Sequence, residues 1–302
     1  MARVRWRPVL GRLGGILLVT GCATAASDSS DRVMITTAPS GAREEIPVTV
    51  GKPAGAGPFP AVVIMHDCSG LGPRSSRAPD RWARELGARG YVTVIPDSFT
   101  TRGRPDGVCT DASPGRADVS PSRRVRDAYA ALAHARALPY VDGRRVGLMG
   151  GSHGGSTTLA AMAAPQNEWD LLAREKRAGF AAAVALYPSC KIALGSWRPD
   201  GTGAYQAVAP LLILIGEKDD WTPAPACVTL AASTRATEHP VAITVYPGAH
   251  HSFDSDRPVR FVAARVNNNA PGGRGATTGG DAAAWADSIR RATEFFAERL
   301  KP

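Results

Sequence analysis

Several features that would place a protein in another class are missing from this sequence of 302 residues. It has no internal repeat, no block of Lys and Arg interleaved with aromatic residues, and no convincing cluster of metal ligands. A repeat array, a nucleic-acid-binding module and a metal centre are therefore not expected. Charged residues make up 21% and hydrophobic residues 44%, which argues against a disordered chain and a membrane bundle. The body of the chain is long enough for one large globular domain.

The first 22 residues differ from this body. Arg3, Arg5, Arg7 and Arg12 form a basic start, and the mostly apolar run Leu10 to Val19 is too short to span a membrane comfortably. Val19-Thr20-Gly21-Cys22 then resembles the bacterial lipobox, in which the cysteine is lipidated. We expect an exported, periplasmic or cell-envelope lipoprotein that contacts the membrane only through Cys22; plain secretion and an uncleaved anchor are the alternatives. Without the four arginines the formal charge falls from +9 to +5, a modest excess.

The expected organisation is a signal segment over residues 1–22, a linker over 23–42 and one folded domain over 43–302. Within the linker, residues 32–37 are a possible edge strand. From residue 46 onward short apolar runs alternate with longer helical segments, which is typical of a doubly wound α/β fold with a mostly parallel sheet. Strands are expected near residues 46–50, 61–65, 91–95, 146–149, 180–187, 210–215 and 241–246, and helices near 80–88, 122–138, 156–164, 224–235 and 282–300. Residues 267–280, rich in glycine and asparagine, are expected to form a mobile loop.

A candidate nucleophile stands where one of these strands turns into a helix. The segment Gly150-Gly151-Ser152-His153-Gly154 fits the G-x-S-x-G pattern of a nucleophile elbow. Its glycines let the backbone pass close to neighbouring segments while the serine is held in a strained turn. The plainer interpretation is a glycine-rich turn with an ordinary serine.

A serine hydroxyl needs a base and a group that orients the base. Asp219 and Asp220 follow one predicted strand, and His250 and His251 follow the next. With Ser152 they give the order Ser, Asp, His of α/β-hydrolases, and all lie past the carboxyl ends of strands, where such sheets bind their ligands. As alternatives, one aspartate caps the following helix, and the histidines are ordinary loop residues.

An acyl-transfer intermediate also needs backbone donors for its oxyanion. In this type of fold one donor is the residue after the nucleophile and the other lies in the loop after the third strand. The amides of His153 and Cys68 occupy these places. For Cys68 the plainer interpretation is a simple turn between strand and helix.

Taken together, these motifs resemble those of the dienelactone hydrolase family of α/β-hydrolases. The resemblance runs from about Ile46 to Leu300 and rests on four segments: residues 64–71, residues 150–155, Gly216-x-x-Asp219 with Thr222-Pro223, and residues 246–253. It implies an α/β-hydrolase fold, no cofactor, and a triad of Ser152, Asp219 and His251, rather than Asp220 or His250. The enzymes that name the family carry cysteine at the nucleophile position, so a dienelactone substrate does not follow for a chain with serine there.

The cysteines fit an exported chain. Without Cys22 an even number remains, which permits two disulfides; four reduced cysteines are the alternative. The strand order of the family implies the pairs Cys68 with Cys109 and Cys190 with Cys227. Each pair would tie down a loop at the active edge of the sheet.

The sequence thus predicts an exported serine hydrolase that cleaves ester or lactone bonds of small molecules through an acyl-enzyme intermediate. No nucleic-acid partner is expected, and the oligomeric state stays open. A serine peptidase and a catalytically silent binding protein of the envelope are the rival functions. Arg102 and Arg104, in the loop after the fourth strand, are either solvated or receive a substrate carboxylate.

Overall fold

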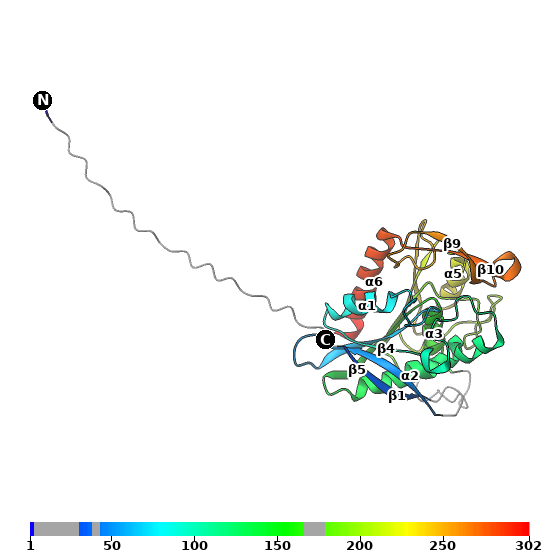
Figure 1. Ribbon diagram of the computed structural model, residues 1–302, viewed down its shortest axis with the longest axis horizontal. Coiled ribbons are helices and arrows are strands. Elements are labelled where there is room, and N and C mark those ends of the chain that lie inside the picture. Colours follow the sequence, from blue (N-terminus) through cyan, green and yellow to red (C-terminus); the bar gives the residue numbers. More distant parts are fainter. Residues whose placement is uncertain (3–29, 38–42, 166–178, 302) are drawn as a thin grey trace.

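The structure of the chain, a computed structural model, describes residues 1–2, 30–37, 43–165 and 179–301. At its centre is an eight-stranded sheet in the order β1-β2-β4-β3-β5-β6-β7-β8 (Figure 1). The strands β3 to β8 pair in parallel, and β1, β2 and β4 pair antiparallel in turn at one edge. The bounds are β1 Ser30–Thr37, β2 Glu44–Gly51, β3 Phe59–Met65, β4 Val92–Pro96, β5 Val141–Gly151, β6 Ala182–Leu186, β7 Leu211–Gly216 and β8 Ala242–Tyr246.

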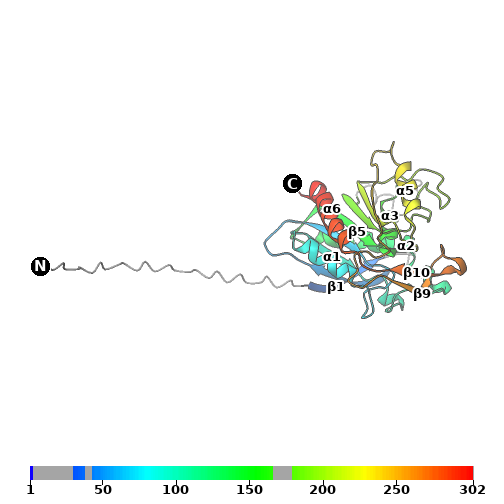
Figure 2. The ribbon, with the colours of Figure 1, turned by 90° about the horizontal axis from the view of Figure 1, so that it is seen from above.

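Helices cover both faces of this sheet (Figures 1 and 2). On one face α1 and α6 pack together, with the rings of Trp82 and Trp285 4.7 Å apart. On the other face α2 and α3 are neighbours, and Tyr129 Oη donates to the carbonyl of Ala161 at 3.0 Å. The bounds are α1 Ala78–Gly87, α2 Pro121–Ala137, α3 His153–Met162, α5 Ala224–Ser233 and α6 Ala282–Leu300. Helices on both faces of a mostly parallel sheet confirm the predicted doubly wound α/β class. Apolar strands such as β6 and β7 are buried on both faces as a result.

An N-cap and two buried side chains position the last helix, α6, on the sheet. Asp281 caps α6 by accepting from the amide of Ala284 at 2.9 Å, a contact that typically stabilises a helix by about 1 kcal/mol. Phe296 and Leu300 are fully buried against Gly147 of β5. Burying each such side chain contributes roughly 1.5–3 kcal/mol. A side chain at Gly147 would overlap with both, so this glycine allows the helix to lie directly on the sheet.

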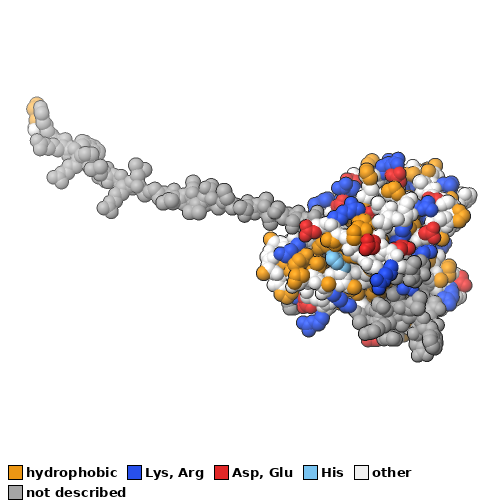
Figure 3. Space-filling view, turned by 60° about the horizontal axis from the view of Figure 1, so that its bottom comes forward, with side chains coloured by type: hydrophobic (Ala, Val, Ile, Leu, Met, Phe, Trp, Pro, Cys, Tyr) orange, Lys and Arg blue, Asp and Glu red, His pale blue; other side chains and the backbone are white. Residues whose placement is uncertain are grey.

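The edge of the sheet includes the strand expected within the linker. Strand β1 pairs with the whole length of β2, in a register that places Ile35 opposite Ile46. The predicted signal segment and Cys22 lie outside the described residues. Among the helices that the structure describes, none is both long and apolar enough to cross a bilayer. On the face shown in Figure 3, basic and acidic side chains are interspersed.

The expectation of a mobile loop at residues 267–280 is wrong. These residues contain a short 3₁₀ turn, Pro271–Gly273, and strand β10, Arg274–Thr278, which pairs antiparallel with β9, Arg260–Val266. The β9–β10 hairpin lies at the periphery of the fold in both views (Figures 1 and 2). The buried side chain of Asn267 holds its turn by donating to the carbonyls of Gly275 at 2.7 Å and Asp220 at 3.0 Å.

Candidate active site

Ser152 occupies a strained turn between β5 and α3. Its φ and ψ angles are 54° and −114°, an arrangement that a non-glycine residue adopts only when the surroundings enforce it. Its amide donates to the carbonyl of Leu186 on β6 at 2.9 Å. A Cβ atom at Gly154 would lie 2.1 Å from the carbonyl oxygen of Met65, and one at Gly150 would lie 2.5 Å from the backbone of Gly154. The glycines of the elbow are therefore required by close contacts between backbone segments.

His251 links Ser152 to Asp219. Its Nε2 atom lies 2.9 Å from Ser152 Oγ, and its Nδ1 atom lies 2.7 Å from Asp219 Oδ2. The exposed fractions of Ser152, Asp219 and His251 are 8%, 3% and 0%. An ionised carboxylate only accepts hydrogen bonds, so this geometry assigns the proton to Nδ1 and leaves Nε2 to accept from the serine hydroxyl.

The carboxylate of Asp219 is held by the turn that follows β7. Its Oδ1 atom accepts from the amides of Trp221 at 3.0 Å and Thr222 at 2.7 Å. The hydroxyl of Thr222 lies 2.9 Å from Oδ2 and 3.0 Å from the carbonyl of Tyr187, so it can donate to either acceptor. The expectation that an aspartate of this pair caps helix α5 is wrong, because Pro223 stands at the N-cap. Asp220 instead accepts from the amide of Thr277 at 2.8 Å and anchors β10.

Two aromatic rings position the imidazole of His251. The rings of Tyr187 and Trp221 each lie 4.8 Å from it. Tyr187 is fixed in turn, since its hydroxyl donates to Asp254 at 2.8 Å. Asp254 also accepts from Trp82 Nε1 at 2.9 Å, and burial raises the pKa of this carboxyl group. The histidine therefore has little freedom to leave Ser152.

Cys68 and His153 line the same cavity as Ser152. Among the described residues, neither of their backbone amides donates to another group. The loop of Cys68 is held by Asp67, whose Oδ1 atom accepts from the amide of Ser69 at 2.7 Å and whose Oδ2 atom accepts from the hydroxyl of Ser76. Two residues that line this cavity thus have backbone amides without an acceptor in the described part of the chain.

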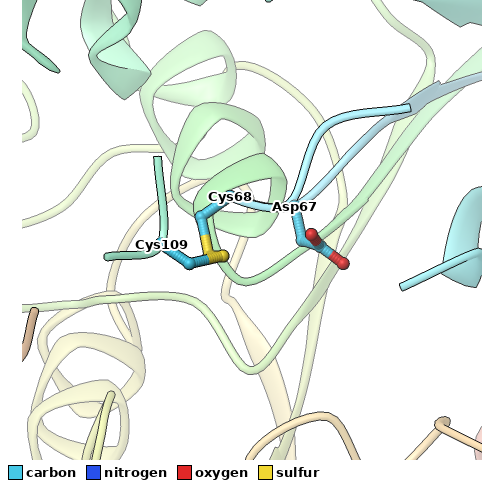
Figure 4. A group of neighbouring side chains, drawn as sticks. All are labelled: Asp67, Cys68 and Cys109. Carbon is cyan, nitrogen blue, oxygen red and sulfur yellow. A yellow bond between two sulfur atoms is a disulfide. The ribbon is translucent and has the colours of Figure 1, made fainter. Parts of the chain in front are cut away.

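Both predicted disulfide pairs are present. Cys68 is joined to Cys109 and Cys190 to Cys227, with Cα atoms 4.9 Å and 5.1 Å apart. The Cys68–Cys109 disulfide ties the loop after β3 to the loop after β4, and Asp67 points away from it (Figure 4). Asp67, Cys68 and Cys109 lie close enough together to suggest metal ligands, but both sulfur atoms belong to the disulfide and supply no thiolate.

Two cavities meet at Ser152, Cys68 and Trp221. The larger has a volume of about 460 Å³ and is bounded mainly by the 113–121 segment, Ile192 and the start of the β9–β10 turn. The smaller, of about 50 Å³, is lined by four arginines, Arg74, Arg257, Arg260 and Arg265, and by Asp67. A substrate whose scissile bond lies at Ser152 would therefore place one part in the larger cavity, which Arg116 also lines, and the other part in the narrow, arginine-rich cavity.

The arginines considered from the sequence lie elsewhere. Arg102 is buried in ion pairs of 2.7 Å with both Asp127 and Glu44, so it is neither solvated nor directed at a substrate. Arg104 pairs with Asp111 at 2.9 Å. Neither lines the cavities beside Ser152.

A buried cluster beneath the elbow was not predicted. Arg124 on α2 donates to His153 Nδ1 at 2.8 Å and to the carbonyl of His66 at 2.9 Å. Burial, followed by the charge of Arg124, holds the pKa of both histidines well below its ordinary value. The available signal was the position of Arg124 in line with Ala128, Ala131 and Ala135 on the buried face of α2, which also carries Asp127.

Comparison with known proteins identifies related folds. The model of the dienelactone hydrolase family matches residues 46–300. Similar solved structures include a candidate dienelactone hydrolase from Klebsiella pneumoniae (20% identity, 90% of this chain and 100% of that chain, TM-score 0.61). A second is the dienelactone hydrolase-like promiscuous phosphotriesterase P91 from metagenomic libraries (19%, 90% and 99%, TM-score 0.58). A third is esterase 2 of Thermogutta terrifontis phosphonylated by cyclosarin (19%, 86% and 92%, TM-score 0.60). No protein with a curated description matches the chain.

Proposed function

The chain belongs to the dienelactone hydrolase family of ester hydrolases, and we propose that it cleaves ester or lactone bonds of small molecules with Ser152 as nucleophile. The observation that carries this proposal is the continuous hydrogen-bonded path from Asp219 through His251 to Ser152, with distances of 2.7 Å and 2.9 Å. It joins three residues that follow three different strands at one edge of the sheet. A glycine-rich turn with an ordinary serine would not require these two hydrogen bonds.

The chemistry follows from the positions of the protons. His251 Nε2 takes the proton of Ser152 as Oγ attacks the carbonyl carbon, and Asp219 stabilises the imidazolium through Nδ1–H. The amides of Cys68 and His153 receive the oxyanion. His251 then gives its proton to the departing alcohol, leaving an acyl-serine. A water molecule, deprotonated by the same nitrogen, releases the acid and restores the serine.

Hydrolysis of p-nitrophenyl esters tests this function. The wild-type protein should release p-nitrophenol with saturable kinetics, and Ser152→Ala should lower kcat by about 10³-fold or more. Asp219→Asn should lower kcat by about 10⁴-fold, because it removes the carboxylate that holds the tautomer of His251. Asp220→Asn is the matched control, since Asp220 contacts β10 rather than the histidine.

The rival functions give distinct results in the same assay. A serine peptidase would cleave p-nitroanilides of peptides in addition to the more reactive p-nitrophenyl esters, whereas an esterase would cleave only the esters. A silent binding protein would fold and release no product from either class. Equal activity of the wild-type protein and Ser152→Ala would reject the proposed nucleophile.

We further propose that the enzyme works in the cell envelope as a lipoprotein anchored through Cys22. Two disulfides support an oxidising compartment. In a bacterial host, the full chain should incorporate fatty acid and partition with membranes, and Cys22→Ala should incorporate none. A full chain without fatty acid in the soluble periplasm would indicate plain secretion, and one without fatty acid that stays with membranes would indicate an uncleaved anchor.

A further inference from the structure

Arg124 is a fully buried cation that joins two backbone segments beneath Ser152. Its Nη1 atom donates to His153 Nδ1 at 2.8 Å, and its Nη2 atom donates to the carbonyl of His66 at 2.9 Å. His153 is the first residue of α3, directly after Ser152. His66 comes two residues before Cys68. One guanidinium group therefore contacts both segments that carry the proposed oxyanion donors.

The two hydrogen-bond partners of Arg124, His153 Nδ1 and the carbonyl of His66, are both neutral. In the described part of the chain, no carboxylate forms an ion pair with it. The buried Asp127, one turn further along α2, is occupied by Arg102 at 2.7 Å and by the hydroxyl of Thr37 at 3.0 Å. Burial lowers the pKa of Arg124 to about 10, so its side chain is still charged at neutral pH. Its Nε atom is buried and has no hydrogen-bond partner among the residues that the structure describes.

Packing holds this group in one orientation. The guanidinium carbon lies 4.9 Å from the centre of the Phe99 ring. The same ring meets His66 edge to face at 4.4 Å and His153 at 5.7 Å. His66 is fixed by its own contacts, since Nδ1 lies 2.8 Å from the carbonyl of Asp67 and Nε2 accepts from the amide of Ser98 at 3.1 Å. The cluster is therefore rigid, and both histidines are neutral.

We propose that Arg124 is a positioning residue for the oxyanion hole: it holds the Cys68 and His153 segments at a fixed separation and keeps a positive charge behind them. The carboxylates of Asp127, Asp67 and Asp97 attract this buried charge without forming an ion pair with it, and buried charges held in this way concentrate at functional sites. If Arg124 contributed only to stability, we would expect it to form an ion pair with the neighbouring carboxylate of Asp127. The inference rests on the proposed serine hydrolase function.

The test compares ligands that do and do not develop an oxyanion. An aryl trifluoromethyl ketone forms a tetrahedral adduct with a serine hydroxyl, whereas the matching methyl ketone binds mainly as the intact carbonyl. Inhibition by both is measured for the wild-type protein, Arg124→Gln and Arg124→Lys, together with kcat and KM for a neutral p-nitrophenyl ester. Tyr129→Phe is the control, because it removes a buried hydrogen bond between the same two helices away from Ser152.

For Arg124→Gln we expect kcat to fall about 10- to 100-fold with KM within threefold, as for loss of part of an oxyanion hole. Affinity for the trifluoromethyl ketone should fall in parallel, with little change for the methyl ketone. Arg124→Lys should be intermediate. Tyr129→Phe should lower only the unfolding temperature. A folded Arg124→Gln protein with unchanged kcat, or with equal losses for both ketones, would overturn the inference.

If Arg124→Gln does not fold, His153→Leu decides the matter, since it removes the acceptor of Arg124 and keeps the backbone amide. A loss of affinity for the trifluoromethyl ketone alone would support the inference, and equal losses of affinity for both ketones would contradict it. A wild-type protein that neither hydrolyses esters nor binds the trifluoromethyl ketone would instead reject the proposed function itself.

Discussion

Cys68, which lines the cavity beside Ser152 and is proposed to supply an oxyanion donor through its amide, is bonded through its side chain to Cys109, 41 residues further along the chain. The amide and the disulfide thus belong to one residue. The second disulfide, Cys190–Cys227, joins the segment after β6 to helix α5 and does not line either cavity.

This difference predicts separate effects of the two disulfides. Replacing either pair by serine should lower the free energy of unfolding by about 2–4 kcal/mol. Only the Cys68→Ser/Cys109→Ser protein should also lose kcat, because the loop that carries the Cys68 amide is no longer tied down. Denaturant unfolding and esterase kinetics on both double variants check this. Equal kcat values in the two would show that the disulfide does not support the site.

The basic cavity predicts a preference for anionic esters. The guanidinium of Arg265 lies 5.0 Å from the Trp221 ring, and its buried Nε atom has no hydrogen-bond partner in the described structure. The ratio of kcat/KM for mono-p-nitrophenyl succinate to that for p-nitrophenyl butyrate should fall about tenfold in Arg265→Gln, the loss expected for one charge-assisted hydrogen bond. Arg274→Gln, on the same hairpin but outside the cavity, should leave the ratio unchanged. An unaltered ratio in Arg265→Gln would contradict this assignment.

Buried His66 and His153 predict a loss of stability in acid. Their pKa values in the folded protein are well below the ordinary value of 6.5, chiefly through burial, so the unfolded chain binds more protons below that pH. Stability is then complete above pH 6.5 and falls as the pH drops, by about 1.4 kcal/mol per pH unit for each group. Urea unfolding between pH 7 and 5 measures this slope. In His153→Gln the slope should lose the contribution of His153, and an identical slope would refute the assignment.

Gly154 predicts a steric limit at the elbow. An added methyl group would overlap with the carbonyl of Met65, so Gly154→Ala should lower the free energy of unfolding by about 1–3 kcal/mol and displace Ser152 from His251. Gly87 ends helix α1 with open space around it, and Gly87→Ala should be neutral or stabilising by up to about 1 kcal/mol. Thermal unfolding and kcat of the two variants check this pair. Comparable values for both would show that the elbow tolerates a side chain.

The sequence was most informative where local pattern and chain order determine the structure. Apolar runs identify the buried strands, and the carboxyl ends of parallel strands meet at one edge, so Ser152, Asp219 and His251 were expected to come together. The β9–β10 hairpin was missed because the buried contacts of Asn267, rather than local strand propensity, fix its turn. Arg124 and Arg265 were missed because their surroundings are assembled from segments distant in sequence. Arg102 was misplaced because its partners, Glu44 and Asp127, are distant in the same way.

Reaction with a fluorophosphonate probe tests the central claim most directly. The probe forms a covalent bond with an activated serine, and the modified peptide can be located by mass spectrometry. We expect stoichiometric labelling of the wild-type protein on Ser152, none in Ser152→Ala, and strongly slowed labelling in His251→Gln, because His251 removes the serine proton. Labelling at a different serine, or no labelling of the folded wild-type protein, would contradict the account.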